Sequence, residues 1–212
     1  MALSVLIIVC LGQGSSAQAQ APAGTPVLLV LGDSLSAAYG IKPEQGWVAL
    51  LAKRIAQRGF TYRVVNASIS GETTRGALAR LPALMSRHRP ALVVLELGAN
   101  DGLRGLPIGE FRRNLRALVD LARGGGARVV ILPVRLPPNY GEAFNSRFVR
   151  VYDEVAAATG ASQSGMFLEG VGGRPELIQE DGLHPRAQAQ ARLLENAWPA
   201  LEAALRAQAP TD

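Results

Sequence analysis

Two histidines occur in the chain, and only one of them has a carboxylate close by in the sequence. His184 follows Asp181 by three residues in the segment "DGLHP". One turn of chain can bring such a carboxylate to an imidazole, where it fixes the tautomer and stabilises the protonated ring. His88 lies between Arg87 and Arg89, in an exposed, cationic setting without an orienting carboxylate, which favours an ordinary surface role. His184 is therefore the expected general base, with Asp181 as the residue that orients it.

A serine that could act as the nucleophile lies near the start of the chain. The apolar run of residues 27–31 stops at "GDSLS", so Ser34 stands where a buried strand ends. A serine hydroxyl becomes a good nucleophile only when a base takes its proton. The alternative interpretation is that Asp33 and Ser34 only cap the start of a helix, because Asp and Ser are common at that position. In the same way Asp181 could cap the final helix, with His184 incidental in its first turn.

Hydrolysis through a serine also needs donors aimed at the oxyanion of the tetrahedral intermediate. Asn100, in "GANDG", can offer its side-chain N–H, and Gly71, in "SISGET", can offer a backbone N–H where a larger residue would crowd a substrate. The backbone N–H of Ser34 is the third candidate. Each residue also has an ordinary interpretation, since Gly and Asn are common in turns.

Apolar runs alternate with helical patterns along the chain. Amphipathic helices are indicated by Trp47, Leu50, Leu51 and Ile55, by Phe111, Leu115, Leu118 and Leu121 or Ala122, by Val149, Tyr152 and Val155, and over residues 187–205. Gly124 to Gly126 end the second of these helices. The expected strands cover residues 27–31, 62–66, 92–97, 128–132 and 165–168.

This alternation predicts an α/β fold, a three-layer α/β/α sandwich around a flavodoxin-like, mostly parallel five-stranded sheet. Ligands of such sheets bind beyond the carboxyl ends of the strands. "GDSLS", "NASISGETT", "LGANDGLRG" and "EDGLHPRA" each follow a strand or precede a helix. We therefore expect the four segments to meet at one rim.

Length and composition limit the kinds of protein that this chain can be. The 212 residues, 48% hydrophobic and 18% charged, suit one domain, expected over residues 25–208. Residues 1–19 resemble a secretory signal peptide, with a short apolar stretch and the cleavage pattern "AQA", which predicts a periplasmic or secreted protein. Cys10, the only cysteine, lies inside this segment, so the mature chain has neither a disulfide nor a thiolate metal site.

The net charge of +5 could attract the chain to anionic lipid, but no motif supports nucleic-acid binding. A nucleophile elbow of the form G-x-S-x-G is absent, which excludes an α/β-hydrolase proper. Neither phosphate-binding glycine motif is present, because "GVGGRP" has Pro175 where the last glycine belongs. A non-catalytic flavodoxin-like binding module stays open as an alternative.

The ordered set "GDSLS", Gly71, "GAND" and "DGLHP" resembles the four blocks of the SGNH (GDSL-type) hydrolases. The resemblance covers residues 27–205. The segments "SGETTRGALARLP", "GANDGLRG" and "RLPPNYG" are most similar to the bacterial periplasmic branch of acyl-CoA thioesterases, lysophospholipases and arylesterases.

The resemblance implies Ser34 as nucleophile, His184 as base, Asp181 as its orienter, and Gly71 and Asn100 as oxyanion donors beside the Ser34 backbone. It implies an ester or thioester of an acyl chain as a small-molecule substrate, no cofactor, no metal and no obligate protein partner. A carbohydrate acetylesterase of the same fold is the alternative activity. The loops after Asn100 and around residues 137–140 are expected to set the preference for acyl-chain length.

Overall fold

The fold is built on a five-stranded sheet in which all neighbouring strands are parallel. The computed structural model describes residues 24–207 of the chain. The strand order is β2-β1-β3-β4-β5. The strands are β1 Val27–Gly32, β2 Arg63–Asn66, β3 Leu92–Glu96, β4 Arg128–Ile131 and β5 Ser162–Gln163.

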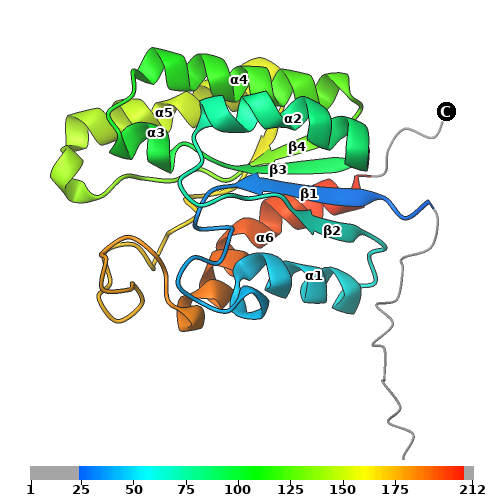
Figure 1. Ribbon diagram of the computed structural model, residues 1–212, viewed down its shortest axis with the longest axis horizontal. Helices are drawn as coiled ribbons and strands as arrows, with labels where there is room; N and C mark the ends of the chain where they lie inside the picture. The colour runs from blue at the N-terminus through cyan, green and yellow to red at the C-terminus, as the bar shows by residue number, and fades with distance from the viewer. Residues whose placement is uncertain (1–23, 208–212) are drawn as a thin grey trace, which may run out of the picture.

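Helices cover both faces of the sheet (Figure 1). Helices α2, α3, α4 and α5 lie on one face, and α1 and α6 lie on the other. The α-helices are α1 Trp47–Gln57, α2 Thr74–His88, α3 Ala99–Leu103, α4 Ile108–Gly124, α5 Glu142–Thr159 and α6 Gln190–Arg206. Short 3-10 helices are η1 Pro43–Gln45, η2 Pro138–Tyr140 and η3 Ala187–Ala189. The three-layer α/β/α prediction is confirmed.

The central strands are apolar along their whole length because neither face meets water. Every residue of β1 and β3 is buried. Four of the five expected strands coincide with β1 to β4 within a residue or two at each end. The expected helices are present as α1, α4, α5 and the pair η3 and α6, and the glycines from Gly124 onward end α4 as predicted.

The expected fifth strand over residues 165–168 is wrong. The fifth strand is Ser162–Gln163, which pairs with β4, and residues 165–168 form a bend and turns. The apolar side chains there serve another purpose: Phe167 is fully buried and its ring lies 5.2 Å from that of Trp47. An apolar run that packs beneath a loop gives the same sequence signal as a buried strand.

The order in which strands are added to the sheet reverses at β1. Strand β2 pairs with one edge of β1, and the next strand, β3, pairs with the other edge. Such a switch point leaves a crevice beyond the carboxyl ends of the two central strands. Ser34 follows β1 and Asn100 follows β3, so both residues stand at this crevice.

The predicted signal peptide and Cys10 lie outside the described residues. Among residues 24–207, no helix has the length and hydrophobicity that crossing a membrane requires.

Gly98 turns the chain from β3 into α3. Its φ of +119° lies in a region that L side chains rarely adopt. A Cβ there would also lie 2.8 Å from ring atoms of Phe111 and collide with the Tyr152 hydroxyl. The turn that presents Asn100 therefore requires glycine.

We expect Gly98→Ala to lower the free energy of unfolding by roughly 2–4 kcal/mol, because backbone strain and overpacking act together. Gly105→Ala is the matched control, since Gly105 has a φ of +65° and open space around it. The control should lose about 1–2 kcal/mol. Urea unfolding of both variants tests this, and equal losses would contradict the packing explanation.

Candidate active site

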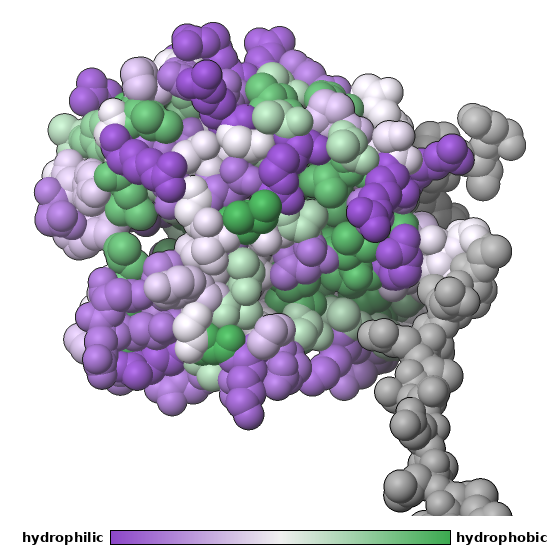
Figure 2. Space-filling view, in the orientation of Figure 1, coloured by the Kyte–Doolittle hydropathy of each residue, from purple (hydrophilic) through white to green (hydrophobic). Residues whose placement is uncertain are grey.

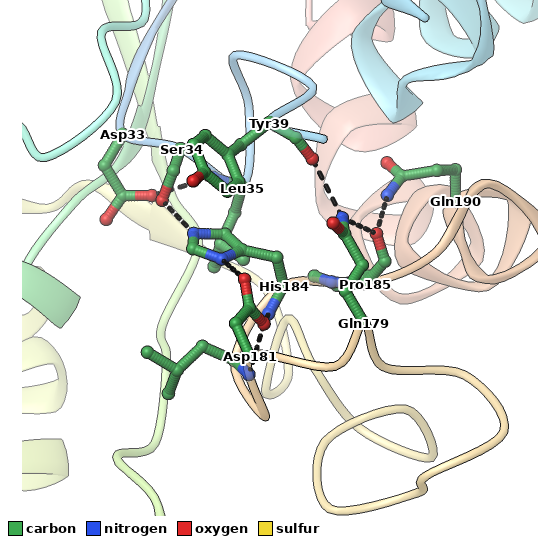
Figure 3. A network of polar contacts seen from close by, with 10 residues as sticks. Asp33, Ser34, Leu35, Tyr39, Gln179, Asp181, His184, Pro185 and Gln190 are labelled. Atoms are coloured by element: carbon green, nitrogen blue, oxygen red, sulfur yellow. Dashed lines mark hydrogen bonds and ion pairs between the residues drawn. The ribbon is translucent and has the colours of Figure 1, made fainter. Parts of the chain in front are cut away.

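The structure brings Ser34, His184 and Asp181 into one hydrogen-bonded row (Figure 3). Ser34 Oγ lies 2.8 Å from His184 Nε2, and His184 Nδ1 lies 2.6 Å from Asp181 Oδ2. The imidazole thus stands between a hydroxyl and a carboxylate. The His184 side chain is mostly buried, with 18% of its surface exposed, whereas that of Asp181 is 37% exposed.

A tight turn presents His184. Ile178 and Pro185 form an antiparallel bridge, and the Gln179 N–H donates to the His184 carbonyl at 2.7 Å. Inside this turn Asp181 Oδ1 accepts from the N–H groups of Leu183 at 2.9 Å and His184 at 3.0 Å. One carboxylate oxygen therefore shapes the turn while the other contacts the imidazole.

The interpretation of Asp181 as the cap of the final helix is wrong. The final helical segment begins with η3 at Ala187, and its N-cap position is Arg186. His184 likewise precedes that helix. The hydrogen bonds of Asp181 also stabilise its ionised form and so lower its pKa. Burial alone would raise the pKa of Asp181, but the hydrogen bonds from the backbone of His184 and Leu183 and from the His184 ring lower it to about 2.

Gln179 ties the serine-bearing loop to the histidine-bearing loop. Its Nε2 donates to the Tyr39 carbonyl at 2.9 Å and to the Pro185 carbonyl at 3.1 Å (Figure 3). The Tyr39 ring in turn lies over the imidazole, with a centroid distance of 4.4 Å to His184. Neither Tyr39 nor Gln179 could be predicted as a site residue, because each contacts a residue about 140 positions away in the chain.

Asn100 reaches the same site through Asp33. The Asn100 amide donates to Asp33 Oδ2 at 3.1 Å, and the Leu35 N–H donates to Asp33 Oδ1 at 3.0 Å. Asp33 caps a turn here, since residues 34–40 form turns and α1 begins only at Trp47. The local interpretation of "GDSLS" as a helix start is therefore wrong, and Asp33 is a site residue that sequence reasoning left as a mere cap.

Three further hydrogen bonds hold the Gly71 segment against the Asn100 segment. Arg104 Nη2 donates to the Gly71 carbonyl at 2.8 Å. The Thr74 N–H donates to Asp101 Oδ2 at 2.9 Å, and the Thr74 hydroxyl donates to the other oxygen of the same carboxylate. Gly71 has a φ of +79°, so its backbone conformation favours glycine, and a Cβ there would lie 3.3 Å from Arg104 Nη2.

His88 lies at the opposite end of the strands, near their amino ends. It is the last residue of α2, directly before β3, and its charged neighbours include Arg63 at the start of β2. Burial, with the charges of Arg87 and Arg63, lowers the pKa of His88. The residue is half-buried rather than exposed as expected, and it is remote from the other predicted site residues.

A cavity of about 560 Å³ opens at Ser34, and Gly71, Asn100 and His184 line it as well. Figure 2 shows the hollow at the left edge of the molecule, above the loop that follows β5. The remaining wall is mostly apolar and includes Leu103, Leu136, Pro137, Met166, Leu168 and Ile178. The described residues contain no cluster of three or more acidic, histidine or cysteine side chains that could hold a metal ion.

Known proteins share this arrangement of fold and sequence. The model of the GDSL-like lipase/acylhydrolase family matches residues 30–192. The chain belongs to this family. Esterase TesA of Pseudomonas aeruginosa is 52% identical over 197 residues, which are 93% of this chain and 94% of that protein.

Two more similarities agree with the family assignment. Thioesterase 1/protease 1/lysophospholipase L1 of Escherichia coli K12 is 40% identical over 168 residues, or 79% of each chain. A crystal structure of TesA superposes with a TM-score of 0.83 at 54% identity, covering 84% of this chain and 99% of that one. This GDSL-type chain is thus a hydrolase, and the alternative of a non-catalytic binding module is set aside.

The low pKa of Asp181 predicts how this residue affects stability with pH. Its pKa is about 2 in the fold and 3.8 without the fold's contacts, so ionisation favours folding. The contribution is fully present above about pH 4 and is lost as the pH falls toward about 2. The difference in free energy of unfolding between the wild type and Asp181→Asn should shrink over that range. Urea unfolding at a series of pH values measures it, and a difference that does not change with pH would contradict the assignment.

Proposed function

We propose that the chain hydrolyses carboxylic esters or thioesters of acyl chains through an acyl-enzyme on Ser34. The observation that carries the proposal is the row formed by Ser34 Oγ, the His184 imidazole and the Asp181 carboxylate, with contacts of 2.8 Å and 2.6 Å. A hydroxyl, a base and an orienting carboxylate in this order can activate a serine.

The chemistry proceeds in two halves. Ser34 Oγ attacks the acyl carbonyl while His184 Nε2 takes the hydroxyl proton, and the resulting imidazolium then protonates the departing alcohol or thiol. Water attacks the acyl-enzyme in the second half, with His184 again as the base. Asp181 keeps the proton of the neutral ring on Nδ1, and its low pKa leaves it ionised throughout.

The oxyanion is assigned to three donors: the Ser34 N–H, the Gly71 N–H and the Asn100 amide. Asn100 offers two N–H bonds, of which Asp33 accepts one at 3.1 Å. The second is free to donate to a bound substrate. Fixed donors of this kind stabilise the charge that develops in the transition state more than the charge of the ground state.

An acyl chain fits the walls of the cavity better than a sugar does. Apolar side chains such as Leu136, Met166 and Ile178 form most of the lining, and these offer no hydrogen bonds to hydroxyl groups. The related enzymes are named as an esterase and as a thioesterase and lysophospholipase. The alternative, a carbohydrate acetylesterase, would need polar groups around the acetyl site.

Transient contact with lipid surfaces is part of the proposal. Three large hydrophobic side chains of the described residues are exposed, namely Tyr39, Ile69 and Leu183. Tyr39 and Leu183 line the cavity, and Ile69 precedes Ser70 and Gly71 of its wall. With a net charge of +5, such a rim suits brief contact with the ester-bearing surface of an anionic membrane.

We expect Ser34→Ala to abolish hydrolysis of p-nitrophenyl acyl esters while the free energy of unfolding stays within about 1 kcal/mol of the wild type. Assays over a series of acyl lengths, with alcohol and thiol leaving groups, would define the substrate class in the same experiment. Ser36→Ala is not a suitable control, because Ser36 is buried and hydrogen-bonded. Ser146→Ala, on the exposed surface of α5, serves instead and should keep full activity. Retained activity in Ser34→Ala would contradict the proposal.

We also propose export, with residues 1–19 as the signal peptide and residues 25–208 as the hydrolase domain. Expression of the full chain in a bacterial host should give a periplasmic protein whose first residue is Gln20, as read by intact mass and N-terminal sequencing. A full-length protein retained in the cytoplasm would contradict this assignment.

A further inference from the structure

A buried carboxyl group lies next to the site and has no part in the steps above. Glu96 is the last residue of β3, where it pairs with Gly32 of β1, and its exposed surface is 0%. Its Oε2 fills the space beside Gly32, because a Cβ on that glycine would lie only 3.0 Å away. An acidic side chain in such a place needs a reason, since burying a charge is strongly unfavourable.

The contacts of Glu96 show which of its two oxygens can carry a proton. The Ser36 hydroxyl donates to Oε2 at 2.8 Å, while the indole N–H of Trp47 donates to Ser36 Oγ at 3.1 Å. Trp47 thereby directs the Ser36 proton toward Glu96. No donor reaches Oε1, which is buried, from any part of the chain that the structure describes. An oxygen without a donor suits a protonated carboxyl, which donates instead.

Asp33, which follows the strand partner Gly32, is the neighbouring group that can accept this proton in a hydrogen bond. Burial, and then the neighbouring charge of Asp33, raises the pKa of Glu96 well above its usual range. Burial also raises the pKa of Asp33, to about 6, although hydrogen bonds from Leu35, Glu96 and Asn100 oppose this. Of the two carboxyl groups, Glu96 is therefore the one that holds a proton more readily.

The titratable and polar groups around the pair come from several elements. The titratable neighbours are Tyr152 from α5, whose pKa is raised by burial and by Glu96, and Asp101 from α3. Ser36 and Trp47 contribute uncharged groups from the loop after β1 and from α1. His184 acts on Asp33 through its charge alone.

We propose that Glu96 is a positioning residue for the oxyanion site, donating a hydrogen bond to Asp33, which in turn holds the Asn100 amide. This inference rests on the proposed function, because it assigns a purpose to the orientation of Asn100. The chain of contacts runs from Trp47 through Ser36, Glu96 and Asp33 to Asn100.

Two physical effects explain how this series of contacts would assist catalysis. A fixed acceptor keeps the second N–H of Asn100 aimed at the carbonyl oxygen of the substrate, so the donor is in place before the charge develops. Asp33 is also an anion close to the site where a second negative charge forms. A hydrogen bond from Glu96 draws the charge of Asp33 away from the oxyanion and so limits the repulsion.

The test compares Glu96→Gln with Glu96→Leu. The amide of Glu96→Gln can donate to Asp33 and accept from Ser36, so its kcat at neutral pH should stay within about threefold of the wild type. Glu96→Leu should lower kcat by roughly tenfold or more with little change in KM, since the lost interaction acts in the transition state.

The alkaline side of the pH profile separates positioning from packing. In the wild type, ionisation of Glu96 ends its hydrogen bond to Asp33 and adds a second charge, so kcat should fall at high pH. Glu96→Gln cannot ionise and should keep its kcat in that range. Leu118→Ala, a fully buried change in α4, is the control and should lower thermal stability while leaving the profile unchanged.

A double-mutant cycle shows whether Glu96 acts through Asn100. Asn100→Ala alone should lower kcat by roughly 10²–10³. Adding Glu96→Leu to it should lower kcat by less than about twofold more, because the positioned group is already absent. A full tenfold further loss would overturn the inference, as would equal losses in Glu96→Gln and Glu96→Leu.

The proposed function and this inference fail in different ways. Activity that survives in Ser34→Ala removes the proposed function. Normal loss in Ser34→Ala together with wild-type kcat in Glu96→Leu removes only the role of Glu96. If Glu96→Leu does not fold, the pH profile of Glu96→Gln decides: a profile identical to the wild type contradicts the inference, and a lost alkaline fall supports it.

Discussion

The hydrogen bond between Ser34 and His184 joins two loops that lie 150 positions apart in the chain. Nothing local can make such a contact. It requires β1 to end where the turn at residues 178–185 is held, and Gln179 supplies the tie by donating to carbonyl groups on both segments. The sheet sets the position of the serine, and the turn, shaped by Asp181, sets the position of the imidazole.

The opposite side of the site depends on the switch point between β1 and β3. Adjacent parallel strands bring Asp33 and Asn100 together just past their carboxyl ends, where the two side chains form a hydrogen bond of 3.1 Å. Gly98 makes the sharp turn into α3 possible, and Thr74 with Asp101 joins the following segment to the Gly71 loop. Asp33 therefore contacts Asn100, a proposed oxyanion donor, while Ser34, its neighbour, contacts His184, the proposed base. One short loop after β1 serves both halves of the proposed chemistry.

Much of this could be predicted because the relevant signals are local. Continuous apolar runs predicted the central strands, since parallel strands are buried on both faces. The switch-point rule then brought Ser34, Gly71, Asn100 and His184 to one rim, where all four line the cavity. The ordered motifs indicated the family that the comparisons show.

The remaining features are set by tertiary contacts. The two-residue strand β5 is polar and lies at the sheet's edge, whereas the apolar residues after it pack under a loop, so composition pointed to the wrong segment. Gln179 belongs to no motif, and its importance comes from the hydrogen bonds that it donates to carbonyl groups on two different segments. Glu96 lies inside the expected strand over residues 92–97, and only the tertiary fold shows that this charged residue is completely buried.

If Ser34 forms the covalent intermediate, a reagent that traps serine nucleophiles should label this residue. The purified protein would be treated with a p-nitrophenyl alkylphosphonate, and the adduct located by intact mass and peptide mapping. We expect one phosphonyl group per chain, on Ser34, and no adduct on Ser34→Ala. An adduct on another residue, or equal labelling of Ser34→Ala, would contradict it.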